Sequence, residues 1–331
     1  MTGSALSPAQ LDRARGTLVG AAVGDALGVP YEFAARLSST AVPEMLGGGL
    51  GDFAPGEWSD DTSMLMAIAL AGAAHRELLS AAALDAVATG FLDWYSSNPP
   101  DIGIQTRGVL SDTQRAVSAT ESVAATMTAA SRQVLVHRPN AAGNGALMRT
   151  APVALAHLDD RSALADAARA VAALTHAHAD AVESCVLWCE SIRVAILTGE
   201  LRLDSGLDLL AADRRDWWDE RLREAADQDP RTFERNGYTV YSWQAAASSA
   251  AHAQASGADR YRDAVFTAIR IGDDTDTTAA ITGALMGAVC GLDAIDEQWQ
   301  RNVHGWPRRD GQASTVDDLI AAADAAVRHR G

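Results

Sequence analysis

Apolar residues recur three and four positions apart along most of the chain, which is the spacing of one face of an α-helix. The first such stretch has a clear start. Ser7 is a preferred N-cap, Pro8 suits the first helical position and Gln10 completes a capping box. The pattern predicts helices over residues 8–27, 62–75, 80–96, 122–136, 161–175, 179–198, 208–227, 242–256, 260–270, 277–290 and 316–328.

Strand-like alternation of apolar and polar residues is nearly absent, and aromatic residues make up only 5% of an alanine-rich chain. Loops rich in glycine and proline separate the helices at residues 47–56, 98–103 and 139–145. No long polar linker, shift in composition or convincing internal repeat divides the sequence. We therefore predict an all-α protein in which residues 1–331 form a single compact domain.

The charge of the chain narrows its possible partners. The formal net charge is −16 at pH 7, whereas phosphate backbones and anionic membranes are bound by basic patches. We therefore expect no nucleic-acid surface and no membrane binding. All 27 basic residues are arginine, which excludes a lysine Schiff base and a P-loop lysine.

The cysteines and apolar stretches indicate the compartment. Three cysteines without paired spacing argue against a secreted disulfide framework, and Cys185 and Cys189 are interpreted as inert core residues on one helix face. Asp25 interrupts the apolar stretch near the N-terminus, and no stretch approaches the roughly 20 residues of a membrane span. These features predict a soluble cytoplasmic protein, with a monomer as the default state.

Two acidic strings stand directly before apolar helices, WSDDT at residues 58–62 and GDDTDT at residues 272–277. One residue suffices to cap a helix. The first string has two carboxylates and a hydroxyl and the second has three carboxylates, which is more than helix capping requires. Carboxylates this dense repel one another, and a cation between the strings would neutralise them. Oxygen ligands without clustered cysteine or a histidine pair favour Mg²⁺ or Mn²⁺, and six such residues could hold two ions.

Other polar residues lie where chemistry is possible. Asp25, inside an apolar helix, either ties helix ends together or supports the metal ligands from behind. GNGALMR at residues 143–149 either offers backbone N–H groups to a phosphate or forms an ordinary turn. Asp101, after a stiff Asn-Pro-Pro loop, is either a turn former or a catalytic carboxylate. His176 and His178 cannot share a helix face, so a single substrate-facing His176 is favoured over a ligand pair.

Seven segments, in their order along the chain, resemble the motifs of the ADP-ribosylglycohydrolase family. They are GTLVGAAVGDALGVPYEF, WSDDTSM, DIG, GNGALMR, LTHAH, NGYTVYSWQAA and IRIGDDTDTTAAITGALMGAVCG. The resemblance runs from Arg15 to Gly291, and DIG with the NGY segment is most similar to the bacterial dinitrogenase-reductase-activating branch. It implies an all-α fold with a cleft that holds two Mg²⁺ or Mn²⁺ ions. The implied metal ligands are Ser59, Asp60, Asp61, Asp274, Asp276 and Thr277.

Two positions depart from the family pattern. Ser59 replaces the usual threonine but keeps its hydroxyl, so coordination should survive. Asp273 stands where a second glycine is usual, which adds a negative charge and a Cβ beside the site. Asp273 could tighten cation binding or point away as a helix cap.

The resemblance also implies removal of ADP-ribose from a modified side chain, often arginine. Asp101 is the first candidate for proton transfer and Glu32 the second. The residues expected around ADP-ribose are Gly103, Gly143, Asn144, Gly145, His176 and Tyr238. The leading hypothesis is a metal-dependent hydrolase of ADP-ribosylated arginine, on a protein or a small guanidine. The alternatives are hydrolysis of another linkage (serine, O-acetyl-ADP-ribose or a nucleobase) and a catalytically silent, crystallin-like ADP-ribose-binding protein.

Overall fold

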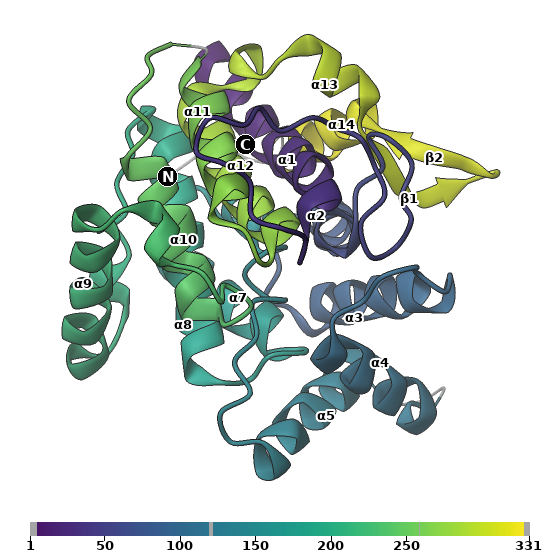
Figure 1. Ribbon diagram of the computed structural model, residues 1–331. Helices are drawn as coiled ribbons and strands as arrows, with labels where there is room; N and C mark the ends of the chain where they lie inside the picture. Colours follow the sequence, from purple (N-terminus) through teal and green to yellow (C-terminus); the bar gives the residue numbers. More distant parts are fainter. Residues whose placement is uncertain (1–4, 119–121, 258, 328–331) are drawn as a thin grey trace.

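The computed structural model describes residues 5–118, 122–257 and 259–327, and this part of the chain contains fourteen α-helices and one small two-stranded sheet at the edge of the molecule (Figure 1). The helices are α1 (Pro8–Gly28), α2 (Asp60–His75), α3 (Ala81–Ser96), α4 (Ile104–Ala116), α5 (Val123–His137), α6 (Ala151–Ala156), α7 (Arg161–Ala173), α8 (Ala179–Thr198), α9 (Ala212–Asp227), α10 (Thr239–Ala251), α11 (Asp259–Ile271), α12 (Thr275–Cys290), α13 (Glu297–Asn302) and α14 (Val316–Val327). The all-α prediction is confirmed.

Helix α1 begins as its sequence predicts. The Ser7 hydroxyl accepts a hydrogen bond from the Gln10 backbone N–H, and the Gln10 side chain accepts one from the Ser7 N–H. Every other predicted helix is also present, but the bounds of two helices were wrong: α9 starts at Ala212 instead of 208, and α10 covers Thr239–Ala251 instead of 242–256. Residue 328, the end of the last predicted helix, lies outside the described residues.

Helices α1 and α12 lie side by side at the centre of the molecule, and at their glycines the two backbones approach each other closely (Figure 1). Glycines occur at positions 16, 20, 24 and 28 of α1 and at 283 and 287 of α12. A Cβ added at Gly24 would lie 2.1 Å from the Ala279 carbonyl oxygen, so only glycine permits this approach. The contact presses the last turn of α1 against the first turn of α12, which makes Asp25 and Asp276 neighbours.

A β-hairpin near the C-terminal end of the chain is absent from the sequence prediction. Strands β1 (His304–Arg309) and β2 (Gln312–Thr315) pair antiparallel around Asp310 and Gly311, which both have positive φ, at 51° and 80°. Asp-Gly is a typical two-residue hairpin turn. The strands escaped detection because they are short and carry Arg308, Arg309 and Gln312 instead of an alternating apolar face.

The core between α8, α9 and α10 is aromatic. The Trp188 and Trp243 rings meet edge to face at 6.2 Å, as do Trp218 and Trp243 at 5.3 Å. Cys185 and Cys189 are buried in α8, where burial raises the pKa of the Cys185 thiol to about 12, so both are inert core residues as predicted. Among the described residues, no helix combines the length and apolar character needed to span a membrane.

Candidate metal centre and adjoining cavity

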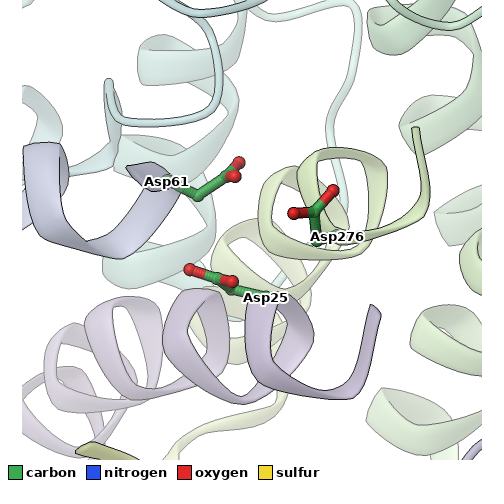
Figure 2. A group of neighbouring side chains, drawn as sticks. All are labelled: Asp25, Asp61 and Asp276. Atoms are coloured by element: carbon green, nitrogen blue, oxygen red, sulfur yellow. The ribbon is translucent and has the colours of Figure 1, made fainter. Parts of the chain in front are cut away.

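Three helices each contribute one carboxylate to a buried group of acids. Asp25 comes from the last turns of α1, Asp61 from the first turn of α2 and Asp276 from the first turn of α12. Each offers an oxygen within 4.8 Å of the others, and Figure 2 shows the three side chains pointing toward one another from their separate helices. The α1–α12 contact thus joins acids that are far apart in the sequence.

Asp25 also holds the start of α2 in place. Its carboxylate accepts hydrogen bonds from the Ser59 N–H at 3.0 Å, the Thr62 N–H at 3.0 Å and the Thr62 hydroxyl at 2.6 Å. It therefore caps α2 in place of Ser59, whose own side chain makes no capping bond. Asp25 thus ties helix ends together, which is one of the two roles suggested by the sequence. It also belongs to the acidic group with Asp61 and Asp276.

Asp61 carries the clearest sign of a missing positive partner. Its Oδ2 accepts hydrogen bonds from the Ser59 hydroxyl at 3.0 Å and the Thr277 hydroxyl at 3.4 Å. Its Oδ1 is buried and has no hydrogen-bond partner among the described residues. A buried acceptor without a partner is costly, and a hard cation among these oxygens would satisfy it. The donor set therefore fits Mg²⁺ or Mn²⁺.

A second acidic group adjoins the first through Asp276. Glu32, Asp274 and Asp276 also offer oxygens within 4.8 Å of one another. Asp274 is held firmly, because it accepts a hydrogen bond from the Asn144 side chain at 2.7 Å and its N–H donates to Asn236 at 2.9 Å. Glu32, expected as a proton carrier, thus lies among the acids of the second string. Two groups that share one carboxylate are the arrangement expected of a two-ion site.

The acids cannot all be ionised without added positive charge. Burial, followed by the charge of Asp274, raises the pKa of Glu32 to about 9. Burial, followed by the charge of Asp101, raises the pKa of Asp60 to about 8. Burial also raises the pKa values of Asp61 and Asp276 well above the ordinary range, with neighbouring carboxylates adding to the effect. A bound cation would favour the ionised carboxylates and so lower these pKa values.

A cavity of about 440 Å³ opens above the acids. The sequence-predicted residues in its wall are Glu32, Asp60, Asp101, Gly103, Gly143, Asn144, Gly145, His176, Asp274, Asp276 and Thr277. Ser59 and Asp61 are buried and do not line this cavity. Phe33, Leu50 and Ile104, which are exposed apolar side chains, also line the cavity and were missed because isolated surface apolar residues carry no sequence signal.

Tyr238 does not line the cavity. Its hydroxyl donates a hydrogen bond to Asp180 at 2.6 Å, and its ring packs edge to face on Tyr241 at 5.4 Å. The Tyr238 backbone pairs with Gly143, and its neighbour Gly237 lies in the cavity wall. Tyr238 therefore positions the glycine-rich loop through its backbone, and its phenol points elsewhere.

A buried chain of donors fixes His176 against the cavity. Arg149 is fully buried over the Phe91 ring and donates a hydrogen bond to the Thr175 hydroxyl at 2.5 Å. That hydroxyl lies 2.8 Å from Nδ1 of His176, which is the only described acceptor for its hydrogen. Burial, with the charge of Arg149, lowers the pKa of His176 to about 3, so the imidazole is neutral. Nδ1 accepts and Nε2 carries the hydrogen, which faces the loop of Gly143 and Gly145.

The histidine ring also explains a glycine. A Cβ at Gly145 would lie 2.9 Å from Cε1 of His176, so a side chain there would displace the ring. His178 has a different task, because it caps α8 by accepting a hydrogen bond from the Asp180 N–H. The preference for His176 over a histidine pair agrees with this placement.

Asp273, the departure from the family pattern, occupies a left-handed backbone position with φ of 64°. Glycine adopts this conformation without strain, whereas other residues do so less readily. The side chain lies beside Arg36 and Glu234, outside the 440 Å³ cavity, and Asp274 is the N-cap of α12. Asp273 therefore neither caps the helix nor lines the cavity, although its charge adds to the effect of burial in raising the pKa of Asp274.

Comparison with known proteins agrees with this architecture. The sequence model of the ADP-ribosylglycohydrolase family matches residues 6–330. The chain is 28% identical over 306 residues to the ADP-ribosylarginine hydrolase Tri1 of Pseudomonas putida (strain GB-1), covering 90% of this chain and 76% of that protein. It is 29% identical over 323 residues to the ADP-ribosyl-dinitrogen reductase glycohydrolase of Rhodospirillum rubrum, covering 96% of this chain and 98% of that protein.

A solved structure shares the fold as well. It is an ADP-ribosylglycohydrolase-related protein complex with a TM-score of 0.72 and 27% identity, and the match covers 97% of this chain and 99% of that chain. Sequence and structure thus agree over nearly the whole length. The chain belongs to the ADP-ribosylglycohydrolase family.

Proposed function

We propose that this ADP-ribosylglycohydrolase is metal-dependent and releases ADP-ribose from ADP-ribosylated arginine. The observation that carries the proposal is the pair of carboxylate groups sharing Asp276, which lines the cavity, with one buried oxygen of Asp61 that no described residue partners. The arginine linkage is supported by relatives named as ADP-ribosylarginine hydrolases at 28% and 27% identity.

The proposed ligands are those of the two acidic strings, joined by Asp25. Ser59, Asp60, Asp61, Asp274, Asp276 and Thr277 would hold two Mg²⁺ or Mn²⁺ ions, with Glu32 and Asp25 close by. When bound, such ions supply Lewis acidity and hold sugar hydroxyls in a fixed orientation. The protein contributes rigid helix ends, so the ligands need little rearrangement.

The remaining cavity wall suits an anion without basic side chains. Gly103 is the N-cap of the 13-residue helix α4, and the loop of Gly143 and Gly145 lies beside it in the same wall. The Gly103 N–H itself donates to the Asp60 carboxylate. The N–H groups of the first turn of α4 and of Gly143 and Gly145, with the Nε2 hydrogen of neutral His176, would bind the pyrophosphate. This explains how a protein of net charge −16 can bind an anionic ligand.

Asp101 is the proposed proton carrier. It lies in the loop that leads into α4 and shares the cavity wall with Asp60. In the reaction, water oxygen bonds to the anomeric carbon, the C–N bond breaks and its electron pair stays with the guanidino nitrogen. Water releases one proton and that nitrogen takes up one, so a carboxylate at the junction can relay it.

The test is ADP-ribose release from matched arginine-linked and serine-linked peptides, with Mg²⁺, Mn²⁺ or a chelator. We expect release from the arginine peptide that depends on the metal. Asp101→Ala should abolish release while calorimetry shows that ADP-ribose still binds. Release from serine alone would replace the proposed linkage, and no release from either peptide with either metal would refute the hydrolase.

A further inference from the structure

A second cavity, of about 300 Å³, lies on the other side of two acids of the site. Asp60 and Asp101 line both this cavity and the 440 Å³ cavity. The remaining wall comes from the segment before α2, the end of α3 with the loop that follows it, and strand β1. The two cavities therefore meet at the carboxylates closest to the proposed chemistry.

Aromatic side chains form much of the wall of the second cavity. Trp58 and Trp94 are buried and Trp306 is half-buried, and all three line the cavity. The Trp58 indole N–H donates a hydrogen bond to the Trp306 carbonyl oxygen at 3.1 Å, which ties the hairpin to the segment before α2. A Cβ at Gly305 would lie 2.3 Å from that indole nitrogen, so the packing is tight. The aromatic walls are thus preorganised.

The charges in this cavity favour a cation. Glu57 at the rim is already paired with the half-exposed Arg308 at 3.0 Å. Asp60 and Asp101, deeper at the junction, form no salt bridge with any described residue. Indole faces and carboxylates together recognise a planar guanidinium, which stacks on aromatic rings and donates several hydrogen bonds to oxygen.

We propose that the second cavity binds the arginine side chain of the substrate as the leaving-group subsite, an inference that rests on the proposed function. ADP-ribose occupies the first cavity, the arginine side chain enters the second, and the scissile C–N bond lies at the junction formed by Asp60 and Asp101. The geometry supports this division because no other described residues line both cavities. Trp58, Trp94 and Trp306 are then specificity-determining residues.

Two adjacent serines at the end of α3 allow a matched test. Ser97 lines the second cavity and Ser96 does not; both are exposed and each makes one side-chain hydrogen bond. Ser97→Phe should obstruct the cavity, whereas Ser96→Phe adds the same group outside it. We expect Ser97→Phe to raise KM for the arginine-linked peptide about tenfold and to leave ADP-ribose affinity unchanged. Ser96→Phe, the control, should change neither quantity.

A binding measurement separates this subsite from the activity. Blocked arginine (N-acetyl-arginine methylamide) is titrated by calorimetry against the full-length protein with ADP-ribose and Mg²⁺ present. We expect binding to the unmodified chain and to Ser96→Phe, and about tenfold weaker binding to Ser97→Phe and Trp306→Ala. If the arginine peptide is hydrolysed but blocked arginine binds all variants equally or none, the subsite is refuted and the activity stands. If blocked arginine binds as expected but no arginine peptide is hydrolysed, the proposed function fails and the subsite stands.

Discussion

Asp276 belongs to both carboxylate groups, so its charge contributes to the repulsion in each. We predict that Asp276→Asn makes the metal-free protein more stable, because burial and the neighbouring carboxylates disfavour the charged side chain and raise the pKa of Asp276. The same variant should lose metal-dependent turnover and the stabilisation caused by added Mg²⁺. Thermal unfolding with chelator or Mg²⁺ measures both effects. Asp216→Asn, an exposed acid on α9, is the control and should change neither; a metal-free Asp276→Asn that is less stable would contradict the repulsion.

Thr175 connects a buried cation to the ring that faces the ligand. We predict that Thr175→Val weakens ADP-ribose binding about tenfold, because the hydrogen bond that orients His176 is lost and Arg149 keeps one fewer acceptor. Nitrogen-15 NMR of His176 should show an unprotonated Nδ1 in the unmodified protein and a mixture of tautomers in Thr175→Val. Thr175→Ser retains the hydroxyl and should restore both properties. A protonated Nδ1 in the unmodified protein would overturn the assignment.

At the residue scale, the acids were predictable because they exceed what helix capping requires. Asp25 was harder, since a lone carboxylate in an apolar helix gives no sign of whether it caps a neighbour or joins a cluster. Here it does both. Tyr238 was misplaced relative to the cavity because sequence order locates its backbone, while its hydroxyl is committed to Asp180, a residue on another helix. The direction of such a side chain depends on residues that are distant in the sequence, so the sequence pattern does not reveal it.

At the element scale, the glycines of α1 and α12 set the distance on which the acidic groups depend. We predict that Gly24→Ala destabilises the protein by about 3 kcal/mol, because its Cβ would lie 2.1 Å from the Ala279 oxygen and the helices would have to separate. Turnover should fall further than the loss of folded protein explains. Gly108→Ala in α4 is the control: nothing lies within 4 Å of its added Cβ, so it should stabilise by about 0.5 kcal/mol or more. Chemical denaturation of both variants tests the contrast, and equal effects would refute it.

Helices with a continuous apolar face were the elements that the sequence predicted well. Helix α4 was missed because Gly108 and the polar residues around it weaken the helical pattern, although its first turn carries the Gly103 cap of the cavity. The hairpin was missed because packing of Trp306 against Trp58, and not an alternating pattern, holds it in place. Helix α4 and the hairpin each line one of the two cavities, whereas the six-residue helices α6 and α13, also absent from the prediction, line neither.

At the scale of the whole molecule, stability should depend on pH and on divalent metal together. The pKa of Glu32 is raised to about 9 and that of Asp60 to about 8, so the folded state retains protons that the unfolded state releases from about pH 4 upward. Their contribution to stability is complete below the unfolded pKa values and is lost as the pH rises toward 8 and 9. We therefore predict that these groups make the chelated protein less stable at pH 9 than at pH 6.

Magnesium should reverse this trend. At about 100 times its Kd, a ligand that binds only the folded state adds about 2.7 kcal/mol per site. Thermal unfolding with chelator and with Mg²⁺ gives two curves of stability against pH for the unmodified protein. Subtracting the curve of Asp60→Asn, measured with chelator, from the corresponding curve of the unmodified protein gives the contribution of Asp60. If the contribution of Asp60 to stability, measured with chelator, rises steadily between pH 6 and pH 9, the predicted direction of the pH dependence is wrong.

The backbone contact between α1 and α12 also bears on how this enzyme could be redesigned. At the glycines of this contact an added Cβ would meet the backbone of the other helix, so a substitution there would alter the spacing of the acids. The hairpin and the end of α3, by contrast, surround the second cavity with replaceable side chains and take no part in the carboxylate groups. Selection for a new target amino acid should therefore diversify residues 97–100, Trp306 and Arg308 and hold α1 and α12 constant.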